Sequence, residues 1–295
     1  MGTSIRKQKT AYLYAFVAIF FWSTIASAFK ISLRYLDVLP LLLYASIVST
    51  VALFAYLLFM GKLSLLSALS REDYLRSALL GFLNPFLYYV ILIKAYSILP
   101  AQEAQPINFI WPIMLVLLSI PLLKQQIRLR TILAITISFF GVFIVATRGD
   151  ILGFKFTSTA GVSLALGSTI IWALFWIYNV RDERDEAVRL FLNFMFGSFF
   201  VFLFALVFGR IKVPNLKGIV GAVYIGLFEM GITFLAWLKA LKLAKTTAHV
   251  ASLIYLAPFL SLVVISYAVP ERIVPSTIVG LVFIVGGIVL QKLWG

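Results

Sequence analysis

The side chains of this sequence that could do chemistry are aromatic rings and a few polar groups set deep inside long apolar segments. Rings stack on aromatic ligands and hold ammonium groups by cation–π contacts, and carboxamides offer both hydrogen-bond donors and acceptors. This combination is typical of a mostly apolar small-molecule site. The predicted substrate-binding residues are Trp22, Asn84, Tyr88, Tyr89, Asn108, Phe109, Trp111, Trp172, Trp176 and Glu229.

Helical spacing brings several of these residues together. Trp172, Trp176 and Asn179 share one face of a helix by steps of four and three residues, and Asn84 and Tyr88 share a face of another. Rings inside an apolar segment also pack against neighbouring helices or meet lipid, so packing stays the alternative for each of them. We expect the shared faces to line a binding cavity.

Three ionisable residues are further candidates. Glu229 would lie well inside an apolar segment, where an ionised group costs about 2.5–3.5 kcal/mol, so it is a candidate for binding a substrate amine or a proton. A hydrogen-bonded contact between helices is the alternative. Glu103 and His249 occupy equivalent positions 146 residues apart and are candidates for gating or proton sensing. Hydrogen bonding near a membrane interface is the alternative for His249, and the sequence shows no partner for either residue.

The composition argues against several kinds of catalyst. The chain has no cysteine, which removes disulfides, thiolate catalysis and cysteine-ligated metal sites. Its single histidine removes paired-histidine zinc sites, and no phosphate-binding Walker motif occurs, so ATP-driven transport by this chain alone is not expected. We therefore predict no enzyme activity, no catalytic residues, no metal and no cofactor.

The overall composition points to a bilayer as the solvent. Of the 295 residues 62% are hydrophobic and only 12% charged, and the mean hydropathy is +1.05, against about 45–50% apolar and about 25% charged residues in soluble domains. A helix needs about 20 apolar residues to cross the hydrocarbon core. The fold class is predicted as all-α integral membrane, one bundle of ten transmembrane helices at 11–33, 38–60, 75–97, 101–122, 130–147, 159–180, 188–209, 217–241, 247–268 and 275–293.

The net charge of +14 indicates the orientation of the chain in the membrane rather than a nucleic-acid site. Across ten crossings, 16 Lys and Arg residues fall on one side and 9 on the other. The positive-inside rule then places both termini in the cytoplasm. The expected location is the bacterial inner (plasma) membrane, which the protein would cross several times. No cleaved signal peptide is expected at the start. The charged run 181–186 is predicted as a solvated loop between two spans.

The two halves of the sequence resemble each other. The segment 81–84 (Gly-Phe-Leu-Asn) recurs 145 residues later as 226–229 (Gly-Leu-Phe-Glu), and Lys94 recurs as Lys239. The predicted repeats are 1–148 with the first five helices and 149–295 with the second five. Because five is odd, the second repeat is inverted, which is the sequence signature of many secondary transporters that work by alternating access.

These residues together resemble the EamA group of the drug/metabolite transporter superfamily. The resemblance rests on Ala257-Pro258, then Pro270-Glu271, then the glycines at 280, 286 and 287, with Gln125 standing in the first half where Glu271 stands in the second. It implies ten helices in two five-helix repeats and secondary transport. The aromatic segment 109–112 (Phe-Ile-Trp-Pro) also resembles the YddG branch, whose members export aromatic and other amino acids.

The predicted function is export of amino acids, aromatic and other neutral ones, or of related small metabolites, across the inner membrane. The expected partners are the amino-acid substrate and the lipid bilayer, without nucleic acid; the oligomeric state is open, and a monomer is compatible with the sequence. One alternative is an exporter of other metabolites or drugs. Another is a membrane-embedded enzyme of lipid or isoprenoid metabolism, which would need clustered carboxylates or histidines. A channel or receptor would need a polar filter ring or a sensor domain.

Overall fold

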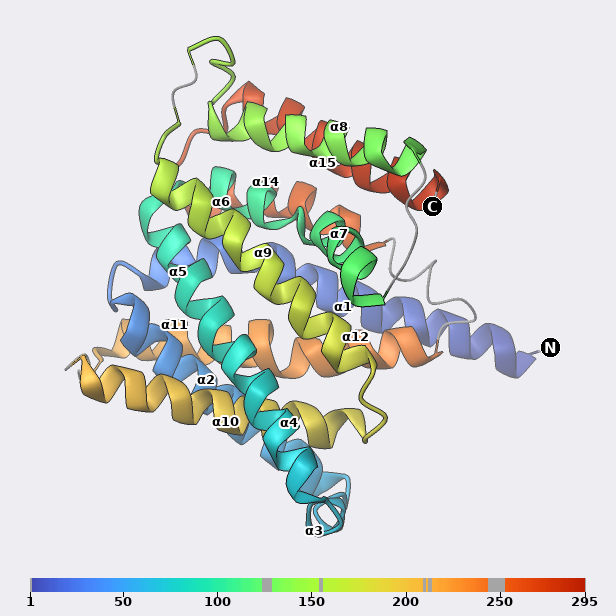
Figure 1. The fold of residues 1–295 in the computed structure, drawn as a ribbon. Coiled ribbons are helices and arrows are strands. Elements are labelled where there is room, and N and C mark those ends of the chain that lie inside the picture. The colour runs from blue at the N-terminus through green and yellow to red at the C-terminus, as the bar shows by residue number, and fades with distance from the viewer. Residues whose placement is uncertain are drawn as a thin grey trace. The chain divides into compact units, whose positions relative to one another are not determined.

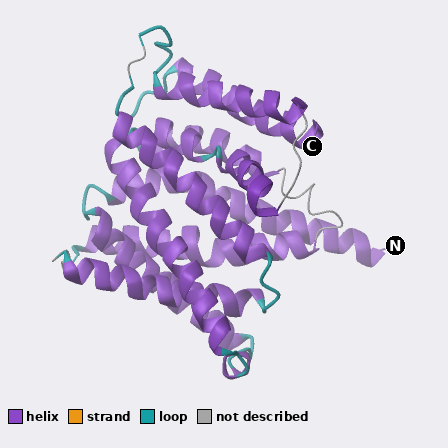
Figure 2. Cartoon of the chain, viewed as in Figure 1, coloured by secondary structure: helices purple, strands orange, loops and turns teal. Residues whose placement is uncertain are grey.

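The computed structural model describes residues 2–123, 129–153, 156–208, 211, 214–243 and 253–294. The regular elements of these described ranges are all helices, joined by loops and turns (Figure 2). The predicted all-helical fold class is confirmed for this part of the chain.

The helices follow one another along the chain as labelled in Figure 1. The first half contains α1 (Gly2–Ser32), α2 (Val38–Phe59), α3 (Ser64–Ser67), α4 (Arg71–Gly81), η1 (Phe82–Leu87), α5 (Tyr88–Ile98), α6 (Ala101–Asn108), α7 (Trp111–Leu123) and α8 (Leu129–Ala146). The second half contains α9 (Thr159–Val180), α10 (Glu186–Val207), α11 (Leu216–Ile225), η2 (Gly226–Gly231), α12 (Ile232–Leu243), η3 (Leu253–Leu256), α14 (Ala257–Ala268) and α15 (Pro275–Trp294).

Seven helical segments of the described chain are long and apolar enough to cross a membrane, namely Lys7–Ser32, Val38–Phe59, Arg71–Ile98, Ala101–Leu122, Thr159–Asn179, Glu186–Val207 and Leu216–Ala240. Three shorter apolar helices of 10–17 residues occupy Ile132–Ala146, Ala257–Ala268 and Pro275–Leu290. Each of these segments overlaps one of the ten predicted spans. Seven of the predicted spans are thus long enough in the described chain to cross a membrane, and the total of ten spans remains a prediction.

Large apolar side chains lie on the outside of these helices. On α1, Leu13, Phe16 and Phe20 are 53–64% exposed and follow one another at helical spacing, so they form one face. An exposed apolar stripe of this kind on a helix of membrane-spanning length suits lipid and not water.

Polar caps fix where several helices begin. Ser70 and Asp73 form a reciprocal capping box at the start of α4, and Asp185 accepts hydrogen bonds from the backbone N–H groups that open α10. Ser158 caps α9 and Asn215 caps α11 in the same way. Each cap satisfies backbone donors that have no partner inside the helix.

Two of the long helical segments are interrupted at corresponding places. Between α4 and α5, Asn84 has φ −149° and ψ 120°, which is extended and not helical. Between α11 and α12, η2 is a π-helical turn that contains Glu229. The predicted helical spacing between Asn84 and Tyr88 is therefore wrong, because the helix does not run through Asn84. Both interruptions coincide with the repeated motif at 81–84 and 226–229.

The chain divides into two compact units, Met1–Phe86 with Glu183–Val264, and Leu87–Asp182 with Ile265–Gly295. In the first unit α1 packs along α12, and α2 packs against α10 and η2. In the second unit α8 packs along α15, and α9 packs against α5, α6 and α7 (Figure 1). Each unit therefore combines helices from both predicted repeats.

The pair α8 and α15 is held at backbone distance by small residues. A Cβ atom on Gly141 would lie 2.5 Å from the carbonyl oxygen of Gly280, so only glycine fits there. Ser138 adds a hydrogen bond of 3.0 Å to the carbonyl oxygen of Ile284. This is the close approach by which helices associate in lipid. Gly286, another of the glycines on which the family resemblance rests, has no atom within 4 Å of the place that a Cβ atom would take.

Candidate functional site

Four of the predicted aromatic site residues lie together in the second unit, on α5 and α9. We call Tyr88, Tyr89, Trp172 and Trp176, with their polar neighbours Asn108 and Ser168, the Tyr88 cluster. The ring centroids of Tyr88 and Trp172 are 4.6 Å apart at 32°, and Tyr88 meets Tyr89 edge to face at 4.7 Å. Trp172 meets Trp176 edge to face at 5.8 Å. These separations lie within the range in which aromatic rings attract.

A chain of hydrogen bonds holds the Tyr88 cluster in register with α6. The Tyr88 hydroxyl donates to Asn108 Oδ1 at 3.4 Å, and Asn108 Nδ2 donates to Ser168 Oγ at 2.9 Å. Ser168 Oγ in turn donates to the carbonyl oxygen of Ala165 within α9. The chain orients the amide of Asn108, which keeps one further N–H donor. Ser168 was not among the predicted site residues, although it lies four residues before Trp172 and therefore on the same helical face.

Phe109 and Trp111 lie at the junction between α6 and α7, where residues 109 and 110 form a turn. Phe109 is buried and Trp111 is half-buried at the first position of α7. Within the second unit, Trp111 and Trp176 thus keep part of their ring surface uncovered, whereas Tyr88, Tyr89 and Trp172 are covered almost completely.

Two further predicted residues meet in the first unit. The indole N–H of Trp22 on α1 donates to the backbone carbonyl oxygen of Glu229 at 3.4 Å. The Trp22 ring also contacts Phe234 and Trp237 at 6.1 and 5.4 Å between centroids. Because a π-helical turn shifts the register of backbone hydrogen bonding, the carbonyl of Glu229 is open to a side-chain donor. Glu229 itself is 7% exposed.

Asn84 is the polar residue of the other interruption. Its side chain is fully buried, and neither its Oδ1 nor its Nδ2 has a hydrogen-bond partner among the described residues. A buried amide that is left unsatisfied costs about 1–3 kcal/mol. Such a group at a break in a membrane helix is a candidate for binding a polar ligand.

Glu103 lies in the first turn of α6 with its side chain fully buried. Its Oε1 accepts a hydrogen bond from Arg148 Nε at 2.6 Å and another from Thr157 Oγ1 at 3.2 Å. Arg148 has φ +53°, an uncommon backbone conformation for a side-chain-bearing residue. These two residues are 45 positions apart, and their spacing does not predict the pairing. His249, the other predicted gating residue, lies outside the described residues.

The glutamate on which the family resemblance rests has a structural partner. Glu271 accepts hydrogen bonds from the backbone N–H groups of Ala101 and Gln102, at 3.2 and 3.4 Å. These groups open α6, so the carboxylate satisfies two free donors and lies at the positive end of the helix dipole. Gln102 Nε2 donates to the carbonyl oxygen of Arg272 at 2.7 Å, and its Oε1 accepts from the N–H of Val274 at 2.9 Å.

The charged run 181–186 is more anchored than the predicted solvated loop. Asp185 accepts a hydrogen bond of 2.6 Å from Lys62, and Arg184 donates to the carbonyl oxygen of Asp73 at 2.8 Å. The hydrogen bond that Lys62 donates to Asp185 raises the pKa of the Lys62 ammonium group. Burial raises the pKa of the Asp185 carboxyl, but the hydrogen bonds from Lys62 and the backbone N–H of Val188 outweigh it, so this pKa lies below its ordinary value.

Comparison with known proteins shows the family to which the chain belongs. The model of the EamA-like transporter family matches residues 9–147 and again residues 159–291. The uncharacterized transporter YvbV of Bacillus subtilis is 28% identical, over 96% of this chain and 92% of that protein. An uncharacterized transporter of Archaeoglobus fulgidus is 25% identical, over 90% of this chain and 92% of that protein.

Two other proteins match this chain. An uncharacterized transporter of Clostridium kluyveri is 26% identical, and the match spans 58% of this chain and about half, 56%, of that protein's length. A protein of known crystal structure superposes with a TM-score of 0.68 at 22% identity, over 97% of each chain, which shows a shared fold. The family and the long apolar helices make the protein a multi-pass membrane protein. The chain belongs to the EamA-like transporter family.

Proposed function

We propose that this protein is a secondary transporter that exports aromatic and other neutral amino acids across the bacterial inner membrane by alternating access. The observation that carries the choice of cargo is the Tyr88 cluster, in which aromatic rings packed at a tilt or edge to face are held beside the oriented amide of Asn108. Rings attract an aromatic side chain, and an amide with a remaining donor suits a carboxylate. The YddG-like segment at 109–112 favours the same cargo.

The proposed architecture is ten spans in two inverted repeats of five. It is supported by the seven long and three shorter apolar helices of the described chain. It is also supported by the family model, whose two matches begin 150 residues apart. The interruptions at Asn84 and in η2 lie at corresponding points of the two repeats, as discontinuous helices do at the substrate sites of other secondary transporters.

Glu229 and Asn84, both in the first unit, are also proposed as substrate-binding residues. Glu229 is buried in an apolar segment and adjoins Trp22, so it offers a negative charge to a substrate ammonium group or to a proton. Asn84 offers a buried amide with no partner in the described chain. A role of Glu229 in packing alone would leave export and its pH dependence unchanged in the Glu229→Gln variant.

The proposed orientation has both termini in the cytoplasm. It rests on the 16 to 9 division of Lys and Arg residues over ten crossings. Fusing a reporter that works only on one side of the membrane to each terminus tests this topology directly.

Counterflow of labelled phenylalanine and tryptophan into liposomes that contain the purified protein tests the proposed function. We expect counterflow that unlabelled aromatic amino acids compete for. Trp172→Ala should raise the half-saturating concentration about two- to tenfold, because an aromatic contact contributes about 0.5–1.5 kcal/mol. The half-saturating concentration of Trp172→Phe should lie between those of the unmodified protein and of Trp172→Ala.

The matched control is Tyr267→Ala, which removes a ring that is 90% exposed and makes no part of the Tyr88 cluster. It should transport as the unmodified protein does. Absence of amino-acid counterflow by well-folded protein would refute the cargo assignment, and equal transport by Trp172→Ala would refute the assigned site.

A further inference from the structure

A groove in the first unit holds a lysine that the proposed transport site does not use. It has a volume of about 160 Å³ and lies between α1, α2 and α12, with Gly231 of η2 at its edge. Apart from that glycine, its walls are Ala52, Leu53, Ile232, Leu235 and Ala236, together with Tyr14, Tyr56 and Lys239. The only cationic group in this lining is the Lys239 ammonium.

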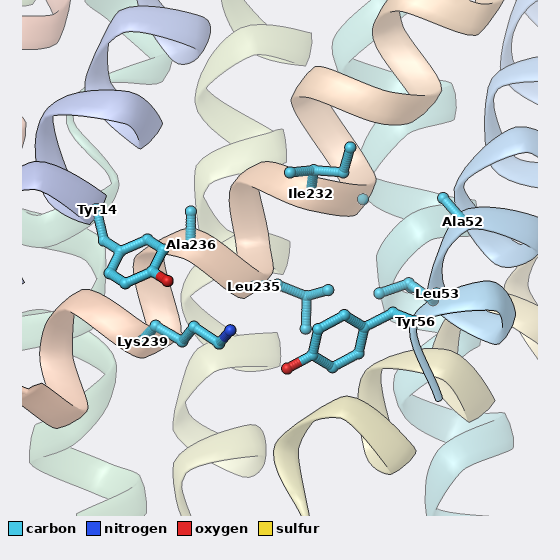
Figure 3. A pocket seen from close by; sticks show the side chains of 9 residues that line it. Tyr14, Ala52, Leu53, Tyr56, Ile232, Leu235, Ala236 and Lys239 are labelled. Atoms are coloured by element: carbon cyan, nitrogen blue, oxygen red, sulfur yellow. The ribbon is translucent and has the colours of Figure 1, made fainter. Parts of the chain in front are cut away.

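Lys239 points into the space between two tyrosine rings (Figure 3). Its Nζ is 5.5 Å from the ring centroid of Tyr14 and 5.4 Å from that of Tyr56. Two cation–π contacts hold the ammonium group in place but do not neutralise it. Within the described ranges Lys239 has no ion pair with a carboxylate. Residues 230–270 contain no Asp or Glu at all, and Glu229 lies ten residues away on the same helical segment.

The charged and apolar residues of the groove follow one another in the same order as the headgroup and acyl chains of a lipid. Lys239 and Tyr56 lie within the last turn of the segments Leu216–Ala240 and Val38–Phe59. In the membrane topology proposed above, both therefore lie at the cytoplasmic interface. Leu235 and Ile232 lie about 6 and 10 Å further along the helix, towards the membrane interior. Ala52 and Leu53 lie about one turn deeper than Tyr56. A charged end at the interface thus continues into an apolar channel towards the hydrocarbon core.

The groove is open at its side, since Ile232 is 45% exposed and Lys239 is half-buried. We infer that it binds one anionic phospholipid, with the phosphate on Lys239 between Tyr14 and Tyr56 and an acyl chain along Leu53, Ile232 and Leu235. Basic pockets between membrane helices on the cytoplasmic side recognise anionic headgroups in this way. The inference does not depend on the cargo, because none of these side chains belongs to the proposed transport site.

Native mass spectrometry of the full chain tests the lipid site, with phosphatidylglycerol titrated against a background of phosphatidylcholine. We expect one phosphatidylglycerol to bind more tightly than the rest. Lys239→Gln should weaken its binding about fivefold, which is what one lysine contributes near an anionic surface. Lys239→Arg should retain it.

Two variants separate this site from the general charge of the protein. Lys217→Gln removes one positive charge of the same unit, which lies over the ring of Tyr35 and outside the groove, and should leave the affinity unchanged. Ala52→Phe fills the groove without changing the charge and should weaken binding, so it carries the test if Lys239→Gln fails to fold.

Three results would overturn the inference. They are an unchanged phosphatidylglycerol affinity in both Lys239→Gln and Ala52→Phe, an equal loss in Lys217→Gln, and complete displacement of the lipid by millimolar inorganic phosphate. The last would mean that the lysine binds any phosphate and that the apolar channel adds nothing.

Discussion

Removing the guanidinium of Arg148 should destabilise the second unit through the carboxylate that it leaves behind. Glu103 is fully buried, and its Oε1 accepts from Arg148 at 2.6 Å and more weakly from Thr157 at 3.2 Å. Its Oε2 has no hydrogen-bond partner in the described chain. In Arg148→Ala the carboxylate stays buried with a single hydroxyl donor.

The expected magnitude follows from the exposure of the two partners. Breaking a fully buried ion pair costs about 3–5 kcal/mol, because the remaining charge is uncompensated. The Arg148 side chain is 48% exposed, so water already screens part of the attraction and the expected loss is about 2–3 kcal/mol. For a chain of this size that corresponds to a fall in Tm of roughly 4–10 °C.

Thermal unfolding of the purified protein in one detergent measures this loss. Glu103→Gln in the Arg148→Ala background should recover more than half of it, since a neutral amide needs no counter-charge. Arg272→Ala, which removes an exposed arginine of the same unit, should change Tm by about 1 °C or less. The reasoning is refuted if Arg148→Ala unfolds at the temperature of the unmodified protein, or if the double variant is no more stable than the single one.

Three further predictions concern stability and use the same unfolding assay. Gly141→Ala should cost about 1–3 kcal/mol, since its Cβ would meet the backbone of α15, whereas Gly286→Ala should be nearly neutral because nothing lies within 4 Å. Asp185→Ala should lower Tm at pH 7 but much less at pH 3. The pKa of the Asp185 carboxyl is lowered in the folded protein, so the ionised carboxylate stabilises the fold above the unfolded-state pKa of about 3.9. This contribution is lost as the pH falls and protonation breaks the hydrogen bond to Lys62. Glu271→Gln should cost about 0.3–1 kcal/mol, through the lost charge at the start of α6. An unchanged Tm in Gly141→Ala, in Asp185→Ala at pH 7 or in Glu271→Gln would contradict the corresponding contact.

Much of the fold was predictable because membrane helices can be recognised by the length and hydrophobicity of their segments. The predicted spans at 38–60 and 159–180 match α2 and α9 to within one residue. The breaks inside the helices were harder to predict. Pro85 follows Asn84 and is a residue type that interrupts helices, so it signals the first break. No residue type signals the π-helical turn around Glu229, which packs against α1 and α2.

The candidate site was predictable where helical spacing decides it. Trp172 and Trp176 lie together because four residues make one turn, as the spacing required. The partnership of Glu103 with Arg148, 45 residues apart, required the course of the loop after α8 and could not be read from spacing. The lysine groove depends on three helices that are remote in sequence, although the recurrence of Lys94 as Lys239 drew attention to one of its residues.

The backbone contact between α8 and α15 bears on how the protein is made. Ser138 and Ile284 are 146 residues apart, so at a synthesis rate of about 5–20 residues per second α8 leaves the ribosome roughly 7–30 s before its partner exists. During that interval the glycine face that later receives α15 is turned to lipid or to the insertion machinery. Assembly of the second unit must therefore wait for the last helix, and a nascent chain released early would leave α8 in the membrane with its partner surface uncovered.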